Sequence, residues 1–149
     1  MTTTYFRSWR DVPADAWRWA NFSPAEIACR CTGKLLVNEA ALDRLQALRD
    51  RLGKPLIVRS AYRSPEHNRA VGGAKRSKHM EGTAFDIAMS NHDPVAFESA
   101  AHDAGFLGFG FYSKTNFMHI DLGPKRKWGD RFPARHRLPS EQERSHVRR

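Results

Sequence analysis

Leucines between residues 37 and 53 recur at the three- and four-residue spacing of an amphipathic helix, and charged side chains fill most of the remaining positions. Gly53 closes this pattern, so we predict that the helix ends there. Two shorter helices are predicted over residues 64–73 and 93–106, because each segment opens with a capping residue followed by a proline.

Strand patterns lie between these helices. Residues 54–62 include a short apolar run and residues 83–89 alternate in character, so both are predicted to be strands. Residues 108–122 predict a hairpin whose turn is the SKTN segment. The order helix, strand, helix, strand, helix, hairpin predicts an α+β domain in which helices flank a small, largely antiparallel sheet.

The N-terminal part of the chain lacks a regular pattern. Residues 6–31 are rich in tryptophan and interrupted by proline, which is typical of an irregular packed arm or of short helices. The expected anchors of this arm against the core are Trp9, Trp17 and Trp19. At 149 residues the chain fits one domain. We assign residues 1–130 to it, the arm of residues 1–21 included, and residues 131–149 to a basic, flexible tail.

The formal charge of +9 is concentrated near the C-terminus. Residues 122–149 hold nine Lys and Arg against three Asp and Glu, a net +6, and the other 121 residues contribute 16 against 13, or +3. Such a tail suits an anionic envelope surface. Beyond Trp128 and Phe132 it lacks interleaved aromatic residues, and it has no recognition motif, so we expect no specific nucleic-acid partner.

Targeting signals are not evident in the sequence. The N-terminus has no basic segment followed by an apolar stretch, as a standard secretory signal would have. No run approaches the roughly 18 apolar residues of a transmembrane helix. We therefore expect a protein made in the cytoplasm, without a transmembrane segment.

Two cysteines, Cys29 and Cys31, form a Cys-x-Cys pair. One pair is too few for a disulfide scaffold or for a four-cysteine zinc site. Such close cysteines rarely bridge to each other, because a disulfide needs a specific approach of the two Cβ atoms. We expect two reduced thiols.

The predicted strand at residues 83–89 carries Asp86 in its middle, between two alanines on the same face. A carboxylate on a half-buried strand is costly unless it is paired or binds a metal. His119 and Asp121 share one face of a later strand, and His79 lies on the approach to the first strand. Three protein ligands with a fourth position for water form the catalytic zinc arrangement. Ordinary hydrogen-bonded or solvent-facing roles are the alternative.

Two segments carry a resemblance to a known family, SAYRSPEHNRAVGGAKRSKHMEGTAFDI and MHIDLG. They resemble the zinc D-alanyl-D-alanine carboxypeptidases and related phage endolysin peptidases, which share a fold with the hedgehog signalling domain. The resemblance runs from about Phe22 to Trp128. Its motif is Ser-x-His-x-x-Gly-x-Ala-x-Asp, followed by a histidine on a later strand. The motif positions are Ser77, His79, Gly82, Ala84, Asp86 and His119.

The resemblance implies a role for each matching position. The implied ligands of a Zn²⁺ ion are His79, Asp86 and His119. Arg63 matches an arginine that binds substrate and helps to polarise its carbonyl group, and Ser77 matches a residue that lines the substrate cleft. Gly82 would let the loop between two ligands turn sharply.

The chain departs from the family pattern near the last ligand. Many members have an acidic general base three positions before it, where this chain has Asn116, and others have a histidine two positions before it, where this chain has Phe117. The remaining nearby carboxylate is Asp121, which would act either as general base or as a group that orients a ligand. Periodicity alone leaves both open, and proximity on one strand face slightly favours the base. If Asp121 does neither, the base would be sought among histidines such as His67 and His92.

The function implied by the resemblance is zinc-dependent hydrolysis of the peptide part of peptidoglycan, by a carboxypeptidase or an endopeptidase. The small size resembles a phage endolysin, which waits in the cytoplasm and acts in the periplasm or cell wall after release. We expect a monomer. The alternative is a non-catalytic, metal-containing module of the same fold that only binds the cell wall, a reading that the missing acid at Asn116 favours.

Overall fold

The computed structural model describes residues 2–133 and contains, within that range, two sheets and four α-helices. The longest helix, α2, spans Glu39–Leu52, where leucines recur at helical spacing. The Asn38 side chain caps its first turn, and Gly53 closes it in a left-handed conformation with φ +64°. The predicted helix and its stop at Gly53 are confirmed, although the residues just before Glu39 belong to a strand.

The two shorter predicted helices are also present. Helix α3 spans Pro65–Ala70, and helix α4 spans Pro94–Asp103. The Ser64 and Asp93 side chains cap them by accepting hydrogen bonds from backbone amides of the first turn. A proline suits the first helical position because its missing N–H would have no partner there.

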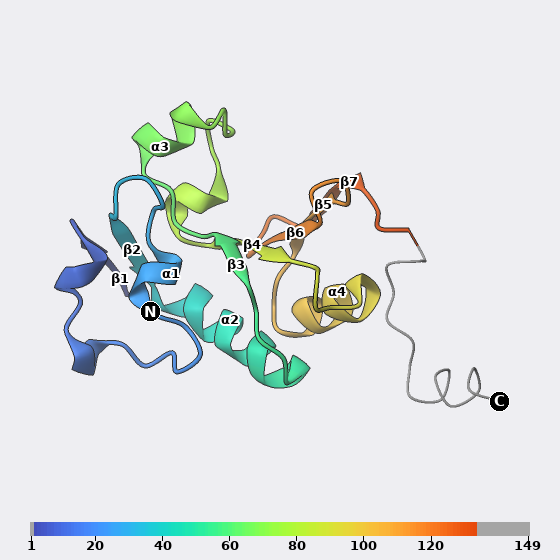
Figure 1. The fold of residues 1–149 in the computed structure, drawn as a ribbon, viewed down its shortest axis with the longest axis horizontal. Helices are drawn as coiled ribbons and strands as arrows, with labels where there is room; N and C mark the ends of the chain where they lie inside the picture. Colours follow the sequence, from blue (N-terminus) through green and yellow to red (C-terminus); the bar gives the residue numbers. More distant parts are fainter. Residues whose placement is uncertain (1, 134–149) are drawn as a thin grey trace.

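The main sheet has five strands in the order β3-β4-β6-β5-β7. Their bounds are Val58–Ser60 for β3, Ala84–Ala88 for β4, Gly108–Tyr112 for β5, Phe117–Asp121 for β6 and Arg126–Asp130 for β7. All neighbours are antiparallel except β5 and β7, which are parallel. The α+β class, the largely antiparallel sheet and the hairpin β5–β6 are confirmed (Figure 1).

Strand β7 was not predicted from the sequence. It lies at the edge of the sheet, four of its five residues are exposed, and Trp128 is its one large apolar side chain. An edge strand with so little buried surface leaves no alternation of polar and apolar residues to detect.

One face of the main sheet packs against α2 and α4, which also contact each other (Figure 1). The buried side chains at this interface include Leu42, Leu45, Leu48, Phe85, Ile87, Phe97, Phe109, Met118 and Ile120. Those that come from the sheet occupy alternate positions of β4, β5 and β6, as the period of a strand requires. The opposite face, on the side of α3, carries the polar residues.

The N-terminal arm contains a second, two-stranded sheet that was also missed. Its antiparallel strands are β1, Thr3–Phe6, and β2, Leu35–Asn38. Short turns and helices separate them: η1 at Trp9–Asp11, η2 at Ala14–Ala16 and α1 at Pro24–Ile27. Four-residue strands that pair across about 30 residues of sequence give little local signal.

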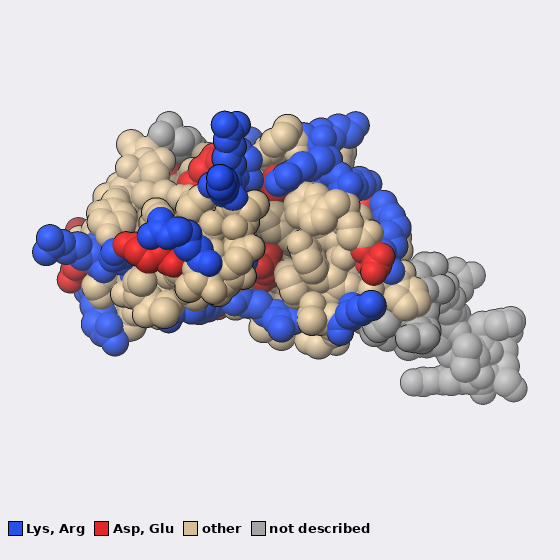
Figure 2. Space-filling view, turned by 90° about the horizontal axis from the view of Figure 1, so that it is seen from above, with Lys and Arg blue, Asp and Glu red and all other residues tan. Residues whose placement is uncertain are grey.

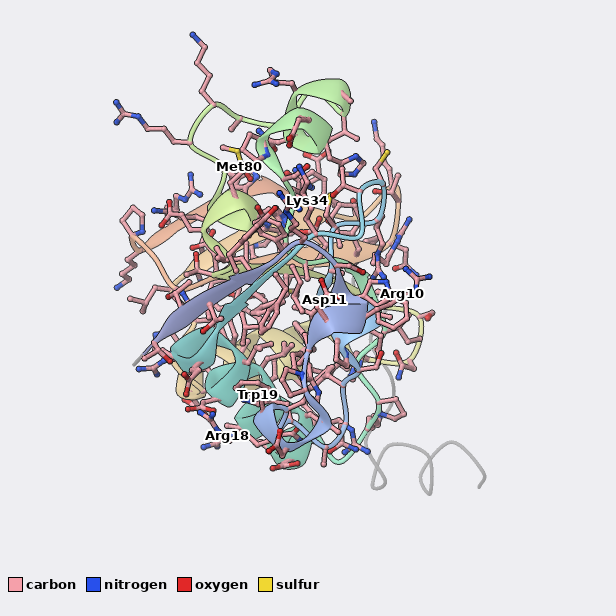
Figure 3. All side chains as sticks on the ribbon, turned by 90° about the vertical axis from the view of Figure 1, so that its left-hand side faces the viewer. Arg10, Asp11, Arg18, Trp19, Lys34 and Met80 are labelled. Carbon is pink, nitrogen blue, oxygen red and sulfur yellow. The ribbon has the colours of Figure 1, made fainter. Side chains whose placement is uncertain are left out.

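The tryptophans anchor this arm, as predicted. Trp19 is buried, and its indole N–H donates to Asp43 of α2 at 2.9 Å (Figure 3). Trp17 packs edge-on against Trp19 at 4.8 Å between ring centroids, and Trp9 is partly buried against the core. The arm therefore packs against the hydrophobic core through its tryptophans.

Three other expectations concern the two cysteines, membrane-spanning helices and the C-terminal tail. Cys29 is buried, Cys31 is exposed, and both are free thiols as predicted. No helix among the described residues has both the length and the apolar character of a membrane span. Residues 134–149 lie outside the described residues, so the basic tail, its boundary and its contact with an anionic envelope stay predictions.

Candidate metal centre

The pairing of the strands brings the candidate ligands onto one face. Asp86 of β4 lies directly opposite His119 of β6, so their side chains project on the same side of the sheet. His79 comes from η3, Lys78–Glu81, which leads into β4. Gly82 ends η3 with φ +73°, a left-handed turn that suits glycine, as predicted.

The three side chains converge on one point. One ligand atom from each of His79, Asp86 and His119 lies within 4.8 Å of the others. His79 Nε2 is 3.2 Å and His119 Nδ1 is 3.0 Å from the same oxygen, Asp86 Oδ1. All three residues are buried, with His119 the most exposed at 8%.

Outer hydrogen bonds assign the tautomers of both rings. His79 Nδ1 donates to the Ala61 carbonyl at 2.6 Å, and His119 Nε2 donates to Asp121 Oδ2 at 2.7 Å. In a neutral ring the inner nitrogen therefore faces Asp86 with a lone pair, whereas a protonated ring donates a hydrogen bond to Asp86. Electron-pair donors so close together repel unless a proton or a cation lies among them. Two imidazoles and a carboxylate, each histidine fixed from behind, form a donor set that suits zinc.

The pKa shifts of the cluster favour an ionised Asp86 with positive charge beside it. Burial alone would raise the pKa of Asp86, but hydrogen bonds with His119 and His79 outweigh it and hold that pKa well below its usual range. Burial alone would lower the pKa of His119, but hydrogen bonds with Asp121 and Asp86 raise it. The site is thus built to keep Asp86 ionised and to hold positive charge beside it.

Asp121 contacts His119 on the side of the ring that faces away from Asp86, and it is not exposed to solvent. Its side chain is fully buried. Oδ2 accepts from His119 at 2.7 Å and from Arg126 at 3.4 Å, and Oδ1 accepts from the Gly123 amide at 2.8 Å. Burial raises its pKa, but the hydrogen bonds with His119 and Gly123 lower it overall. A general base works best with a pKa near the working pH and with access to water. The position of Asp121 therefore favours the orienting role over the base.

Two glycines of β5 make room for this arrangement, and the sequence reasoning missed them. Gly108 lies opposite Asp121 and Gly110 lies opposite His119. A Cβ atom at Gly108 would be 2.1 Å from Asp121 Oδ1, and one at Gly110 would be 2.6 Å from the Trp128 ring. The signal in the sequence was the GFGFY segment, in which one strand face has glycine at two successive positions.

We predict that Gly108→Ala displaces the Asp121 carboxylate, because the added methyl group cannot fit beside it. The expected cost is about 1–3 kcal/mol of unfolding free energy, together with weaker metal binding, because the displaced carboxylate would no longer orient the His119 ring. Thermal denaturation and metal titration measure the two effects. Gly110→Ala is the matched control, since it displaces Trp128 instead and should change metal affinity less. Equal metal affinity in wild type and Gly108→Ala would contradict the packing argument.

The cluster lies in the lining of a cleft of about 560 Å³. Arg63 and Ser77, the two residues that the resemblance assigns to the substrate, also line it. Arg63 points its guanidinium at Asp86 Oδ2, 3.5 Å away, and Ser77 caps η3 by accepting from the His79 amide at 3.2 Å. Tyr112, Phe117 and Trp128 line the cleft as well.

The departures from the family pattern have structural explanations. Asn116 occupies the β5–β6 turn with φ +58°, a left-handed conformation that asparagine tolerates well. Phe117 stacks on Tyr112, with ring centroids 4.5 Å apart. Neither His67 nor His92 is among the described residues that line the cleft, and His92 Nε2 instead donates to the Pro55 carbonyl. Among the described lining residues, Asp86 is the one carboxylate.

Comparison with known proteins gives a consistent picture. A family model described as peptidase M15 matches residues 20–121. The Escherichia coli K12 protein named peptidoglycan L,D-endopeptidase MepK is 38% identical over 104 residues, which cover 62% of this chain and 54% of that protein. The Streptomyces albus G protein named zinc D-Ala-D-Ala carboxypeptidase is 37% identical over 89 residues, covering 57% and 35%. The matched part of the chain thus spans about half the length of the MepK relative and about a third of the length of the carboxypeptidase.

Proposed function

The chain belongs to the peptidase M15 family, and from this premise we propose that it is a zinc-dependent peptidase that hydrolyses the peptide part of peptidoglycan. The observation that carries the proposal is the convergence of His79, Asp86 and His119 within 4.8 Å in the lining of a cleft. The names of two relatives, a peptidoglycan endopeptidase and a zinc carboxypeptidase, support the choice of substrate and metal.

In this proposal His79 Nε2, an Asp86 oxygen and His119 Nδ1 hold the zinc ion. Zinc held there would lower the pKa of a bound water strongly, towards neutrality, and would polarise a carbonyl group. Arg63, hydrogen-bonded to Ser60 and Asn68 as well as to Asp86, presents a fixed guanidinium to the substrate carbonyl. Ser77 forms part of the wall against which the peptide lies, and Asp121 keeps the His119 ring oriented.

The proposal includes the place of action but leaves the scissile bond open. The two relatives are named for different bonds, since one is an L,D-endopeptidase and the other a D-Ala-D-Ala carboxypeptidase. We place the activity at the cell wall, where this substrate lies. Release in the manner of a phage endolysin stays a prediction from the sequence.

A direct test is the release of new amino groups from purified peptidoglycan by the full chain. We expect release with zinc, none after the metal is chelated, and recovery when zinc is returned. The rival function, a metal-containing module that only binds the wall, predicts binding to the same peptidoglycan with no amino groups released under any condition. Mass spectrometry of the fragments then identifies the bond.

We predict that Arg63→Lys loses most of the activity while the bound zinc is retained. Arg63 makes its three contacts through three different nitrogens, Nε, Nη1 and Nη2. An ammonium group cannot reproduce this planar fork of donors. Turnover and metal content of the variant measure the two effects separately. Near-normal turnover would mean that Arg63 has only a structural role.

A further inference from the structure

The cleft is strongly cationic. Four basic side chains line it, Arg63, Arg76, Lys78 and Arg126, against the single carboxylate of Asp86. Figure 2, which looks onto the α3 side of the molecule, shows Lys and Arg side chains projecting at several places, with fewer Asp and Glu. Such an excess in a concave site favours ligands that bring negative charge.

Three of the four cations already have partners. Arg63 contacts Asp86 at 3.5 Å, and Lys78 pairs with Glu81 at 3.1 Å. Arg126 contacts Asp121 at 3.4 Å and also lies over the Trp128 ring, 4.5 Å from its centroid. Within residues 2–133, no hydrogen bond, ion pair or ring contact is found for the Arg76 side chain. Its five donors are available to a ligand in the cleft.

The segment that carries Arg76 is tied to the site. Asn68 is buried, donates to the Ala74 carbonyl at 2.9 Å and accepts from Arg63 at 3.3 Å, so one side chain links the two arginine-bearing segments. Gly73 permits this link, since a Cβ atom there would be 2.0 Å from Asn68 Oδ1. The Ser77 amide donates back to Ala74, which closes a turn around Arg76.

The two walls of the cleft differ in chemistry. The segment from Gly72 to Lys78 forms a basic wall, while Tyr112, Phe117 and Trp128 form an aromatic wall beside His119. A guanidinium binds a carboxylate through two parallel hydrogen bonds, and it recognises a neutral amide much less well. The basic wall therefore has a means to distinguish an acid from its amide.

We propose that Arg76 is a specificity-determining residue that binds a free carboxylate of the substrate peptide, so that the enzyme prefers stem peptides with that carboxyl group free over the same peptides carrying a carboxamide. This inference rests on the proposed peptidase function and adds the substrate class, an acidic peptide. Its charged group would lie against the basic wall while the scissile peptide bond lies at the metal centre of His79, Asp86 and His119.

The test uses the full zinc-loaded chain and pairs of synthetic peptidoglycan stem peptides that differ only in one group, a free carboxyl or its carboxamide. Each carboxyl group of the peptide is amidated in turn. For at least one pair we expect kcat/KM to be about tenfold higher for the acid, as befits one charge-assisted hydrogen-bonded contact. Arg76→Gln should remove this preference by lowering kcat/KM for the acid alone, mainly through KM.

Arg69→Gln is the matched control, because Arg69 is exposed on α3 and does not line the cleft. It should keep the wild-type preference. Equal rates on acid and amide in every pair, or an equal loss on both in Arg76→Gln, would overturn the inference while leaving peptide hydrolysis in place. If no peptide is hydrolysed, the proposed function fails instead. In that case the same peptide pairs are titrated into the protein by calorimetry. The inference requires the acid to bind more tightly than the amide in the wild type and equally tightly in Arg76→Gln.

Discussion

Replacing His79, Asp86 or His119 by alanine, one at a time, is expected to reduce peptidoglycan hydrolysis to the rate of the metal-free protein and to lower the bound zinc. Three protein ligands leave none to spare, since the fourth position of a catalytic zinc ion holds water. Removing either histidine would also leave the Asp86 carboxylate, now 3.0–3.2 Å from both rings, with one buried partner fewer. Metal analysis of the purified variants and amino-group release measure the two losses.

The control is His102→Ala, because His102 is exposed on α4, outside the cleft. It should retain both zinc and activity. The assignment of the ligands would be wrong if all three alanine variants kept full zinc occupancy. Activity lost with zinc retained in only one of them would mean that this residue acts on the substrate and does not hold the metal.

Asp121→Asn is the second substitution with a large expected effect. Whether it lowers zinc affinity or the catalytic rate distinguishes an orienting residue from a general base. For a residue that orients His119, we expect zinc affinity to fall by about 10–100-fold, and excess zinc should restore much of the rate. The amide still occupies the space opposite Gly108 but loses the charge that His119 Nε2 contacts at 2.7 Å. Competition with a zinc chelator gives the affinity, and rates at increasing zinc concentration give the rescue.

The competing role for Asp121, general base, predicts a different pattern. The rate would fall by roughly 10²–10⁴ while zinc affinity stayed nearly unchanged, and added zinc would restore nothing. The structure favours the first pattern, because both Asp121 oxygens already accept hydrogen bonds and the side chain is fully buried. A variant with wild-type rate and wild-type zinc affinity would contradict both roles.

The elements that position the site were predictable because they depend on local patterns. The alternation in β4 and β6 placed Asp86, His119 and Asp121 on polar faces, and the leucine period gave the long helix that covers the other side of the sheet. The caps of α3 and α4 followed from single side chains next to a proline. These signals lie within a few residues of one another, and tertiary packing did not override them.

The remaining features depend on residues far apart in the sequence. Gly108 leaves room for Asp121, and Gly110 leaves room for Trp128. Both relations become visible only from the strand order β6-β5-β7. The distinction between base and orienting carboxylate also depended on burial and on the Gly123 amide, which strand periodicity cannot supply. Edge strands such as β7, with one large apolar residue, are visible only through their pairing.

The proposed activity requires zinc held by two imidazoles and one carboxylate, and X-ray absorption at the zinc K-edge of the loaded full chain measures this directly. The predicted spectrum has one four-coordinate zinc per chain, with only nitrogen and oxygen neighbours at about 2.0–2.2 Å and the multiple scattering of two imidazole rings. Sulfur neighbours at about 2.3 Å would instead place the metal at Cys29 and Cys31. That result, or a spectrum without imidazole scattering, would contradict the proposed centre at His79, Asp86 and His119.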